Sequence, residues 1–248
     1  MLGTAVGSFL NVWSRRLLRG QPPTGRSRCE YCGHLLAPQD LVPLFSFLLL
    51  RGRCRYCRQP LSWQYPLVEL GTGLVFASIL LITGYEFLTA APLLIASSAL
   101  IVVFVTDLQK EVIFDQVLGV VGGGALLYRL LIRLPSADYQ RLAYDLIGAL
   151  GVYFFLQAIR RVTRGRGLGD GDPPLGLGAA LLVGFPLLLV EVFLAFVIGG
   201  AVGASLVLAR KRSLKDRIAF GPFLVIAVFA TLFFGDQLWS WYLGILGL

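Results

Sequence analysis

Two aspartates, Asp107 and Asp172, lie far apart in the chain at points where apolar sequence meets polar sequence. Asp107 follows the apolar run LIVVFV, and Asp172 lies in the stretch GLGDGDPPLGLG, residues 167–178. Two carboxylates that share a partly dry site do not both ionise easily, so one can act as a base on water while the other donates to a carbonyl oxygen. This pair predicts hydrolysis of a peptide without a metal. We expect the two side chains to face each other across a water-filled notch at the cytoplasmic ends of the fourth and sixth membrane spans.

Glycines surround Asp172. They let the backbone take positive φ angles and leave room for another backbone to approach closely. We therefore expect Gly169 and Gly171 to bind an extended substrate segment. Binding of an extended segment favours hydrolysis, because a helical substrate must unwind before water can reach one of its carbonyl groups.

Other interpretations of the acids remain open at this point. Asp107 alone could be a helix-end acid that emerges into water. Carboxylates at the ends of half-helices also bind ions, so a carboxylate-gated membrane transporter is an alternative. The only histidine, His34, lies between two cysteine pairs, which leaves a Ser-His-Asp triad without a base in the membrane. The sequence also lacks an HExxH motif, which excludes that type of zinc protease.

The composition is that of a membrane protein, with 56% hydrophobic and 15% charged residues and a mean hydropathy of +0.76. We predict an all-α polytopic membrane protein of about eight transmembrane helices. Their expected ranges are 1–17, 65–83, 88–106, 112–132, 140–160, 173–186, 187–209 and 219–235. This gives three parts: a first helix at 1–17, a cytoplasmic segment at 18–64 and a transmembrane domain at 65–248. The tail at 236–248 carries two tryptophans and a tyrosine and is expected to be interfacial.

The distribution of basic residues predicts the orientation. The segment 18–64 and its borders, the loops at 160–166 and 210–217, and Lys110 together hold 19 of the 22 lysines and arginines. Only Arg129, Arg133 and Arg141 fall on the other side. Because the basic side faces the cytoplasm, Asp107 and Asp172 are both expected there. The net charge of +8 therefore reflects membrane topology, and we expect no nucleic acid partner.

All four cysteines lie in the segment 18–64, as Cys29-x-x-Cys32 and Cys54-x-x-Cys57. Paired CxxC motifs at this separation are typical of a tetrahedral zinc site. A disulfide framework is the competing interpretation, but thiols stay reduced in the cytoplasm. The sequence therefore predicts one structural Zn²⁺ bound by Cys29, Cys32, Cys54 and Cys57.

Together these motifs resemble a known family. The string GLGDGD is similar to the GxGD motif of intramembrane aspartic proteases, and the chain as a whole resembles the prepilin peptidase, or type IV leader peptidase, family. The other similar stretches are GSFLNV at 7–12, LLRGRC at 49–54 within the cysteine segment, YPLVEL at 65–70 and FGPF at 220–223.

The resemblance implies an aspartic endopeptidase in the bacterial inner membrane, with its active site facing the cytoplasm. It would cleave the leader from type IV prepilins or type II secretion pseudopilins, and it would also N-methylate the new N-terminus with S-adenosylmethionine. By motif position, Asp107 and Asp172 correspond to the two catalytic aspartates, and Asp170 occupies the variable position of GxGD. The segment 65–248 would then be the peptidase domain.

Three positions depart from the family pattern. Pro174 stands where a lysine is common, Phe114 stands where the family has proline before Asp115, and Leu18 stands where it has proline after Arg16-Leu17. The first two lie near the acids, so an inactive membrane scaffold of the same fold is a further alternative.

Overall fold

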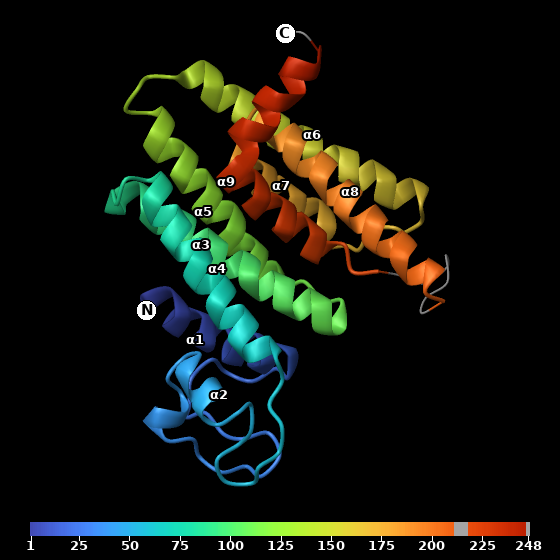
Figure 1. Ribbon diagram of the computed structural model, residues 1–248. Coiled ribbons are helices and arrows are strands. Elements are labelled where there is room, and N and C mark those ends of the chain that lie inside the picture. The colour runs from blue at the N-terminus through green and yellow to red at the C-terminus, as the bar shows by residue number, and fades with distance from the viewer. Residues whose placement is uncertain (211–217, 247–248) are drawn as a thin grey trace. The chain divides into compact units, whose positions relative to one another are not determined.

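The protein is described by a computed structural model that covers residues 1–210 and 218–246. The helices are α1 (Leu2–Leu18), the 3-10 turn η1 (Pro38–Asp40), α2 (Phe45–Leu49), α3 (Gln64–Ile82), α4 (Phe87–Lys110), α5 (Asp115–Arg133), α6 (Tyr139–Val162), α7 (Asp172–Val183), α8 (Leu187–Leu208) and α9 (Gly221–Leu246), all shown in Figure 1. Within the described ranges, the only β-structure is two isolated bridges, Arg28 with Leu35 and Arg53 with Pro60. The fold is all-α, as predicted.

The chain divides into two compact units, Met1–Leu81 and Ile82–Leu248. In the first unit α1 crosses α3 at very short range. A Cβ added to Gly3 would lie 2.9 Å from the Cβ of Phe76, and one added to Gly7 would lie 2.8 Å from Oγ1 of Thr72. Gly3 and Gly7 are four residues apart, so they form one small-residue strip on α1 that lets the helices meet without side chains between them.

The second unit is built around α7. This helix is only 12 residues long, yet ten of them are buried, and it packs against α5, α6, α8 and α9. Figure 1 shows α6, α7 and α8 side by side in this unit. A side chain on Gly176 would collide with Leu156 of α6, and a Cβ on Gly178 would lie 2.9 Å from Val121 of α5. Both glycines therefore allow α7 to be enclosed on all sides.

Six of the described helices are long and apolar enough to cross a membrane: α3, α4, α5, α6, α8 and α9. The apolar helix α7 is shorter, with 12 residues, and α1 has 17. The molecule is thus a polytopic α-helical membrane protein with six to seven candidate spans.

Several sequence predictions need correction. Asp107 belongs to the last turn of α4, the third predicted span and not the fourth, because the helix continues to Lys110. The last predicted span, 219–235, ends too early, because α9 runs from Gly221 to Leu246. The interfacial position of the tail stays a prediction. Asp145 and Glu191 are both fully buried, although both are acids in helices that are apolar enough to cross a membrane. The basic loop predicted at 210–217 lies, apart from Arg210, outside the described residues.

Candidate active site at Asp107 and Asp172

Asp107 lies where α4 ends. The helix stops at Lys110, because Glu111 takes a left-handed φ of 55° and its N–H donates to the carbonyl oxygen of Asp107 over 2.8 Å. The Asp107 side chain is only 4% exposed. The backbone N–H of Gly221 lies against this carboxyl group without completing a hydrogen bond to Oδ2, which has no partner within residues 1–210 and 218–246. A buried oxygen is usually hydrogen-bonded, so Oδ2 can accept a hydrogen bond from a water molecule or a substrate group.

Asp172 is the first residue of α7 and is 3% exposed. Its Oδ2 accepts a hydrogen bond of 2.6 Å from the backbone N–H of Gly169. Pro173 and Pro174 follow it in the first turn, where helix N–H groups have no intrahelical acceptor. The unusual Pro174 is therefore compatible with the helix.

One cavity of about 530 Å³ is lined by both aspartates, which lie 65 residues apart in the sequence. Its wall also includes residues 111–113, 164–171, Ala219 and Phe220. Both carboxylates are buried at the wall of this cavity. A volume of this size is typical of ligand sites, and the expected juxtaposition of the two acids is present.

Ile113 packs against two glycines, Gly171 beside Asp172 and Gly221 beside Asp107. A Cβ on Gly171 would lie 2.7 Å from the Cβ of Ile113, and a Cβ on Gly221 would lie 2.5 Å from Oδ2 of Asp107 and 3.3 Å from Cδ1 of Ile113. Gly171 and Gly221 are therefore required for close packing. Phe114, the other departure, is an extended residue that caps α5 with φ −92° and ψ 129°.

The backbone conformation of the glycines next to Asp172 differs from the expectation. Positive φ angles occur at Arg164 and Gly165, but Gly167, Gly169 and Gly171 do not have them. Gly169 uses its N–H to bind Asp172, and Gly171 leaves space that Ile113 fills. Both still line the cavity, so their binding of substrate stays a prediction.

Asp170 is 87% exposed and pairs with Arg160 of α6. Asp115, the other acid nearby, begins α5 and is exposed. Neither contributes a buried carboxylate beside Asp107 and Asp172, which agrees with their exclusion from the predicted pair.

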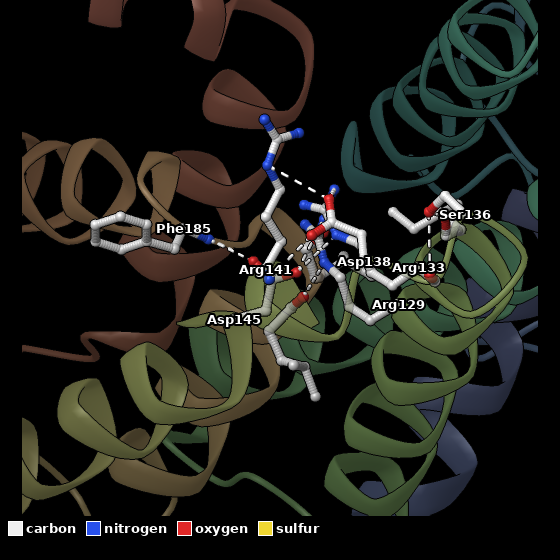
Figure 2. Close-up of polar contacts among 10 residues, drawn as sticks. Arg129, Arg133, Ser136, Asp138, Arg141, Asp145 and Phe185 are labelled. Atoms are coloured by element: carbon white, nitrogen blue, oxygen red, sulfur yellow. Dashed lines mark hydrogen bonds and ion pairs between the residues drawn. The ribbon is translucent and has the colours of Figure 1, made fainter. Parts of the chain in front are cut away.

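At the opposite end of α7, a buried ion pair that sequence analysis missed holds the helix (Figure 2). Arg129 of α5 donates from Nε to the carbonyl oxygen of Leu181 and from Nη2 to that of Leu182, each over 2.8 Å. These are carbonyl groups of the last turn, which lack intrahelical partners. The sequence signal for Arg129 was its place inside an apolar run, where charged side chains are rare.

Asp145 of α6 completes this cluster. It accepts hydrogen bonds from the N–H of Phe185 over 2.8 Å and from Nε of Arg133 over 3.2 Å, and it lies 3.8 Å from Nη1 of Arg129. A Cβ on Gly184, which has a φ of 78°, would lie 2.5 Å from Cζ of Arg129. We call Arg129, Arg133, Asp145 and Gly184 the α7 clamp.

The four cysteines of the first unit form a second candidate site. Their sulfur atoms lie within 4.8 Å of one another, and Cys29 Sγ is 3.8 Å from Cys57 Sγ. All four are free thiols. A tetrahedron of sulfurs about 2.3 Å from a zinc ion has edges of about 3.8 Å, so the group is consistent with a metal site.

The two CxxC motifs fold as near copies of each other. The N–H of Cys29 donates to the oxygen of His34, and that of Cys54 donates to the oxygen of Gln59, both over 2.9 Å. The residue after each motif has a left-handed φ, 69° at Gly33 and 61° at Arg58. Each loop thus turns its two sulfurs toward the other pair.

Comparison with known proteins gives consistent matches. Residues 1–83 match the Bacterial Peptidase A24 N-terminal domain, and residues 94–204 match the Type IV leader peptidase family. A protein of Aeromonas hydrophila named prepilin leader peptidase/N-methyltransferase is 34% identical, covering 88% of this chain and 74% of its own. A protein with the same name from Burkholderia pseudomallei strain 1026b is 32% identical, and the match covers 95% of this chain and 84% of that protein. Another from Bacillus subtilis strain 168 is 30% identical, and the match covers 98% of this chain and 96% of that protein. No solved structure matches significantly.

Proposed function

We propose, for a chain that belongs to the type IV leader peptidase family, that Asp107 and Asp172 are the catalytic pair of a membrane aspartic endopeptidase. Prepilin leader peptidase/N-methyltransferase is the activity of the relatives that align with most of the chain. The observation that supports the assignment is the single cavity lined by two buried carboxylates, one of which has an oxygen without a partner.

In this mechanism one aspartate, ionised, takes a proton from a water molecule while that water's oxygen forms a bond to the scissile carbonyl carbon. The other aspartate, protonated, donates a hydrogen bond to the carbonyl oxygen. When the C–N bond breaks, the leaving amine takes up the proton that the first aspartate accepted from water. The pair then returns to its starting state, so no metal is needed for this step.

The substrate proposed is a type IV prepilin or a type II secretion pseudopilin, bound in extended form along residues 167–171. Its backbone must leave helical form at the cleavage point. Ile113, Gly169 and Gly171 line the cavity on that side. The inactive-scaffold alternative predicts no cleavage at all, although the carboxylates of the site are present.

In the full proposal α1 and α7 are membrane segments too, which makes eight. The distribution of basic residues supports a position of the cysteine segment and the catalytic cavity on the cytoplasmic side of the bacterial inner membrane. The metal held by Cys29, Cys32, Cys54 and Cys57 would be a structural Zn²⁺. A closed set of four thiolates leaves no position for a substrate, so the ion would stabilise the loop rather than take part in hydrolysis.

The methylation step would use S-adenosylmethionine, which supplies an electrophilic methyl group when bound. The proposal assigns this step to the first unit, because its water-facing segment at 18–64 can receive a polar, charged donor.

The test is a cleavage assay in detergent with a synthetic prepilin, with and without S-adenosylmethionine, followed by mass spectrometry. We expect leader release in both conditions and a methylated N-terminus only with the donor. A purified, folded protein that releases no leader from any prepilin or pseudopilin would contradict the peptidase assignment.

A further inference from the structure

One face of α3 is exposed and apolar along the whole helix. Its opposite face is buried, and there α1 packs against Thr72 and Phe76. On the exposed side, large apolar residues recur at helical spacing from the residue before the helix onward: Trp63, Leu67, Leu70, Leu74 and Leu81. Because α3 is long and apolar enough to cross a membrane, lipid is the environment that suits this stripe.

Trp63 extends the stripe beyond the start of the helix. It is 69% exposed and stands one residue before α3 begins. The N–H of Leu67 donates to the carbonyl oxygen of Trp63 over 3.2 Å, so Trp63 takes part in the first helical turn. Tryptophan favours the level of the lipid headgroups, where its ring meets apolar chains and its N–H meets polar groups. Trp63 thus indicates where the stripe reaches the membrane surface.

A groove of about 410 Å³ lies between Trp63 and α2. The ring centroid of Phe47 in α2 lies 5.1 Å from that of Trp63. The other large residues of α2 are mostly exposed, with fractions of 53% for Phe45, 69% for Leu48 and 81% for Leu49. The apolar surface of α2 therefore continues the stripe of α3. An exposed apolar surface of this kind marks an interaction site.

Two arginines, Arg51 and Arg53, are the charged part of the groove lining. Both are exposed, and neither forms an ion pair with an acid in the part of the chain that the structure describes. By contrast, Arg15, Arg19 and Arg55 of the same unit are each paired with an acid. Unpaired guanidinium groups beside an apolar surface fit a ligand that has an anionic head and an apolar tail.

The turn that carries the two arginines is fixed by Phe47. Arg51 and Gly52 have left-handed φ angles of 51° and 66°. The N–H of Gly52 donates to the carbonyl oxygen of Phe47 over 2.8 Å, and a Cβ on Gly52 would lie 3.0 Å from the Phe47 ring. A left-handed residue with a side chain persists only where surrounding contacts impose it. The turn therefore holds the backbone of Arg51 and Arg53 beside the apolar groove.

We propose that this groove binds a membrane phospholipid, with its phosphate group at Arg51 and Arg53 and one acyl chain along Trp63 and Leu67. A guanidinium group can donate two parallel hydrogen bonds to a phosphate, and removal of the acyl chain and Leu48 from water favours the contact. The face of the segment 18–64 that carries α2 then lies on the bilayer surface. None of these residues belongs to the proposed catalytic pair or lines its cavity.

The position of α2 can be measured by fluorescence quenching in lipid nanodiscs. In the full chain with all four tryptophans replaced by phenylalanine, Leu48→Trp places a single reporter at the groove. We expect lipids brominated on their acyl chains to quench it strongly and the water-soluble quencher acrylamide to quench it weakly, because the reporter lies among lipid. Quenching by acrylamide alone would place α2 in water, and protection from both quenchers would indicate a protein cover. Either result would overturn the proposal.

Tyr31→Trp in the same background is the matched control. Tyr31 is 64% exposed and does not line the groove. Acrylamide should therefore quench this reporter, and brominated lipid should not.

The phosphate contact needs a second measurement. Native mass spectrometry would count the phospholipid molecules that stay on the detergent-purified protein. We expect Arg51→Gln with Arg53→Gln to lower lipid occupancy by about tenfold, because both charged partners of the phosphate are lost. Arg26→Gln with Arg28→Gln removes two exposed arginines outside the groove and should retain the lipid. Wild-type occupancy in the first double variant, or the same loss in both, would overturn the proposal.

A further variant covers the case in which substitution of Arg53 disturbs the adjacent Cys54. Leu48→Asp leaves that loop unchanged and places an anion where the acyl chain and phosphate would lie. Because Leu48 is mostly exposed, we expect this variant to fold, as checked by circular dichroism and gel filtration, and to lose the lipid. Unchanged lipid occupancy in folded Leu48→Asp would contradict the site. Neither measurement depends on leader cleavage.

Discussion

At the scale of single residues, the candidate active site depends on two carboxyl groups and on the small residues beside them. Gly221 is an example, since any side chain there would occupy the space of the Asp107 carboxylate. A substitution at Gly221 would therefore act on the acid directly. The two aspartates are distinguished from their acidic neighbours by burial, because Asp170 and Asp115 are exposed.

The catalytic pair gives the first prediction. Asp107→Asn or Asp172→Asn should remove nearly all leader cleavage, and the double variant should cost little more, because groups that act as a unit are not additive. The pH dependence of cleavage should be bell-shaped, with two apparent pKa values that belong to the pair and not to either residue alone. Asp170→Asn and Asp115→Asn are the matched controls and should keep substantial activity. Substantial cleavage by a folded Asp107→Asn protein would exclude this mechanism.

Arg58 gives a second prediction at this scale. Its left-handed φ of 61° matches that of Gly33 in the other CxxC loop. A left-handed φ destabilises a residue that has a side chain by about 1–2 kcal/mol. Glycine avoids this strain, but it loses more chain entropy on folding, which costs about 0.5–1 kcal/mol. Arg58→Gly should therefore stabilise the protein by up to about 1 kcal/mol, measured as a higher Tm in detergent. Arg58→Ala, which keeps a Cβ, should give no such gain, and an equal gain would refute the backbone explanation.

At the scale of elements, α7 connects the catalytic site with the α7 clamp. Twelve residues of helix span about 18 Å, with Asp172 at one end and the carbonyl groups bound by Arg129 at the other. The hydrogen bonds from Arg129 join the C-terminal end of this helix to α5, and Asp145 lies beside Arg129. Arg129 and Asp145 therefore act as positioning residues for Asp172.

Removal of the clamp tests that role. Arg129→Met leaves two helix-end carbonyl groups and part of Asp145 unpaired, and should lower the free energy of unfolding by about 3–5 kcal/mol. In the protein that remains folded, kcat for leader cleavage should fall more than KM rises. The reason is that the variant displaces the Asp172 carboxylate but leaves the rest of the proposed substrate-binding cavity in place. Arg129→Lys, which keeps the charge but not the forked geometry, should recover only part of kcat.

Arg141 provides the matched control for the clamp. It pairs with Asp138 at the exposed start of α6, and among the described residues it forms no ion pair with α7. Because exposed ion pairs contribute little, Arg141→Gln should change stability by no more than about 0.5 kcal/mol and leave kcat unchanged. A similar loss of kcat in Arg141→Gln and Arg129→Met would show that position along α7 is not the cause.

At the scale of the whole molecule, the chain combines a unit that carries the four-cysteine cluster with a unit that carries the two aspartates, and we expect that each can be disturbed separately. Metal analysis should find about one zinc ion per chain, and Cys54→Ser should lower that content and destabilise the segment 18–64. Protease digestion of this segment with and without a chelator is the measurement. Unchanged metal content in Cys54→Ser, or a disulfide in freshly purified reduced protein, would contradict the zinc site.

The two activities should be separable as well. Asp172→Asn, although inactive as a peptidase, should still methylate a pilin peptide whose leader has already been removed, because the methyl donor is assigned to the first unit. Mass spectrometry of the peptide N-terminus provides the measurement. Equal loss of both activities in a folded Asp172→Asn protein would show that methylation depends on the aspartate pair.

The fold class, the long helices and the cysteine cluster of this protein could be predicted from local sequence. Hydropathy predicted the membrane class and the long helices, because a segment that crosses lipid must be apolar along its length. The CxxC spacing predicted that four sulfurs would gather, and the motifs predicted the family. The choice of Asp107 and Asp172 as the catalytic acids came from motif position and still awaits the substitutions described above.

Tertiary structure decided what depends on distant segments. Arg129 and Asp145 each looked like an isolated charge in its own helix, since nothing local indicates that they meet at the end of α7. The glycines near Asp172 suggested backbone freedom, yet their importance is the close approach of Ile113 and the N–H bond to the acid. A further cavity, around Glu69, likewise exists only because GSFLNV and YPLVEL, more than 50 residues apart, pack across the α1–α3 crossing. Composition and spacing constrain each helix separately, whereas burial and pairing are properties of the assembled helices.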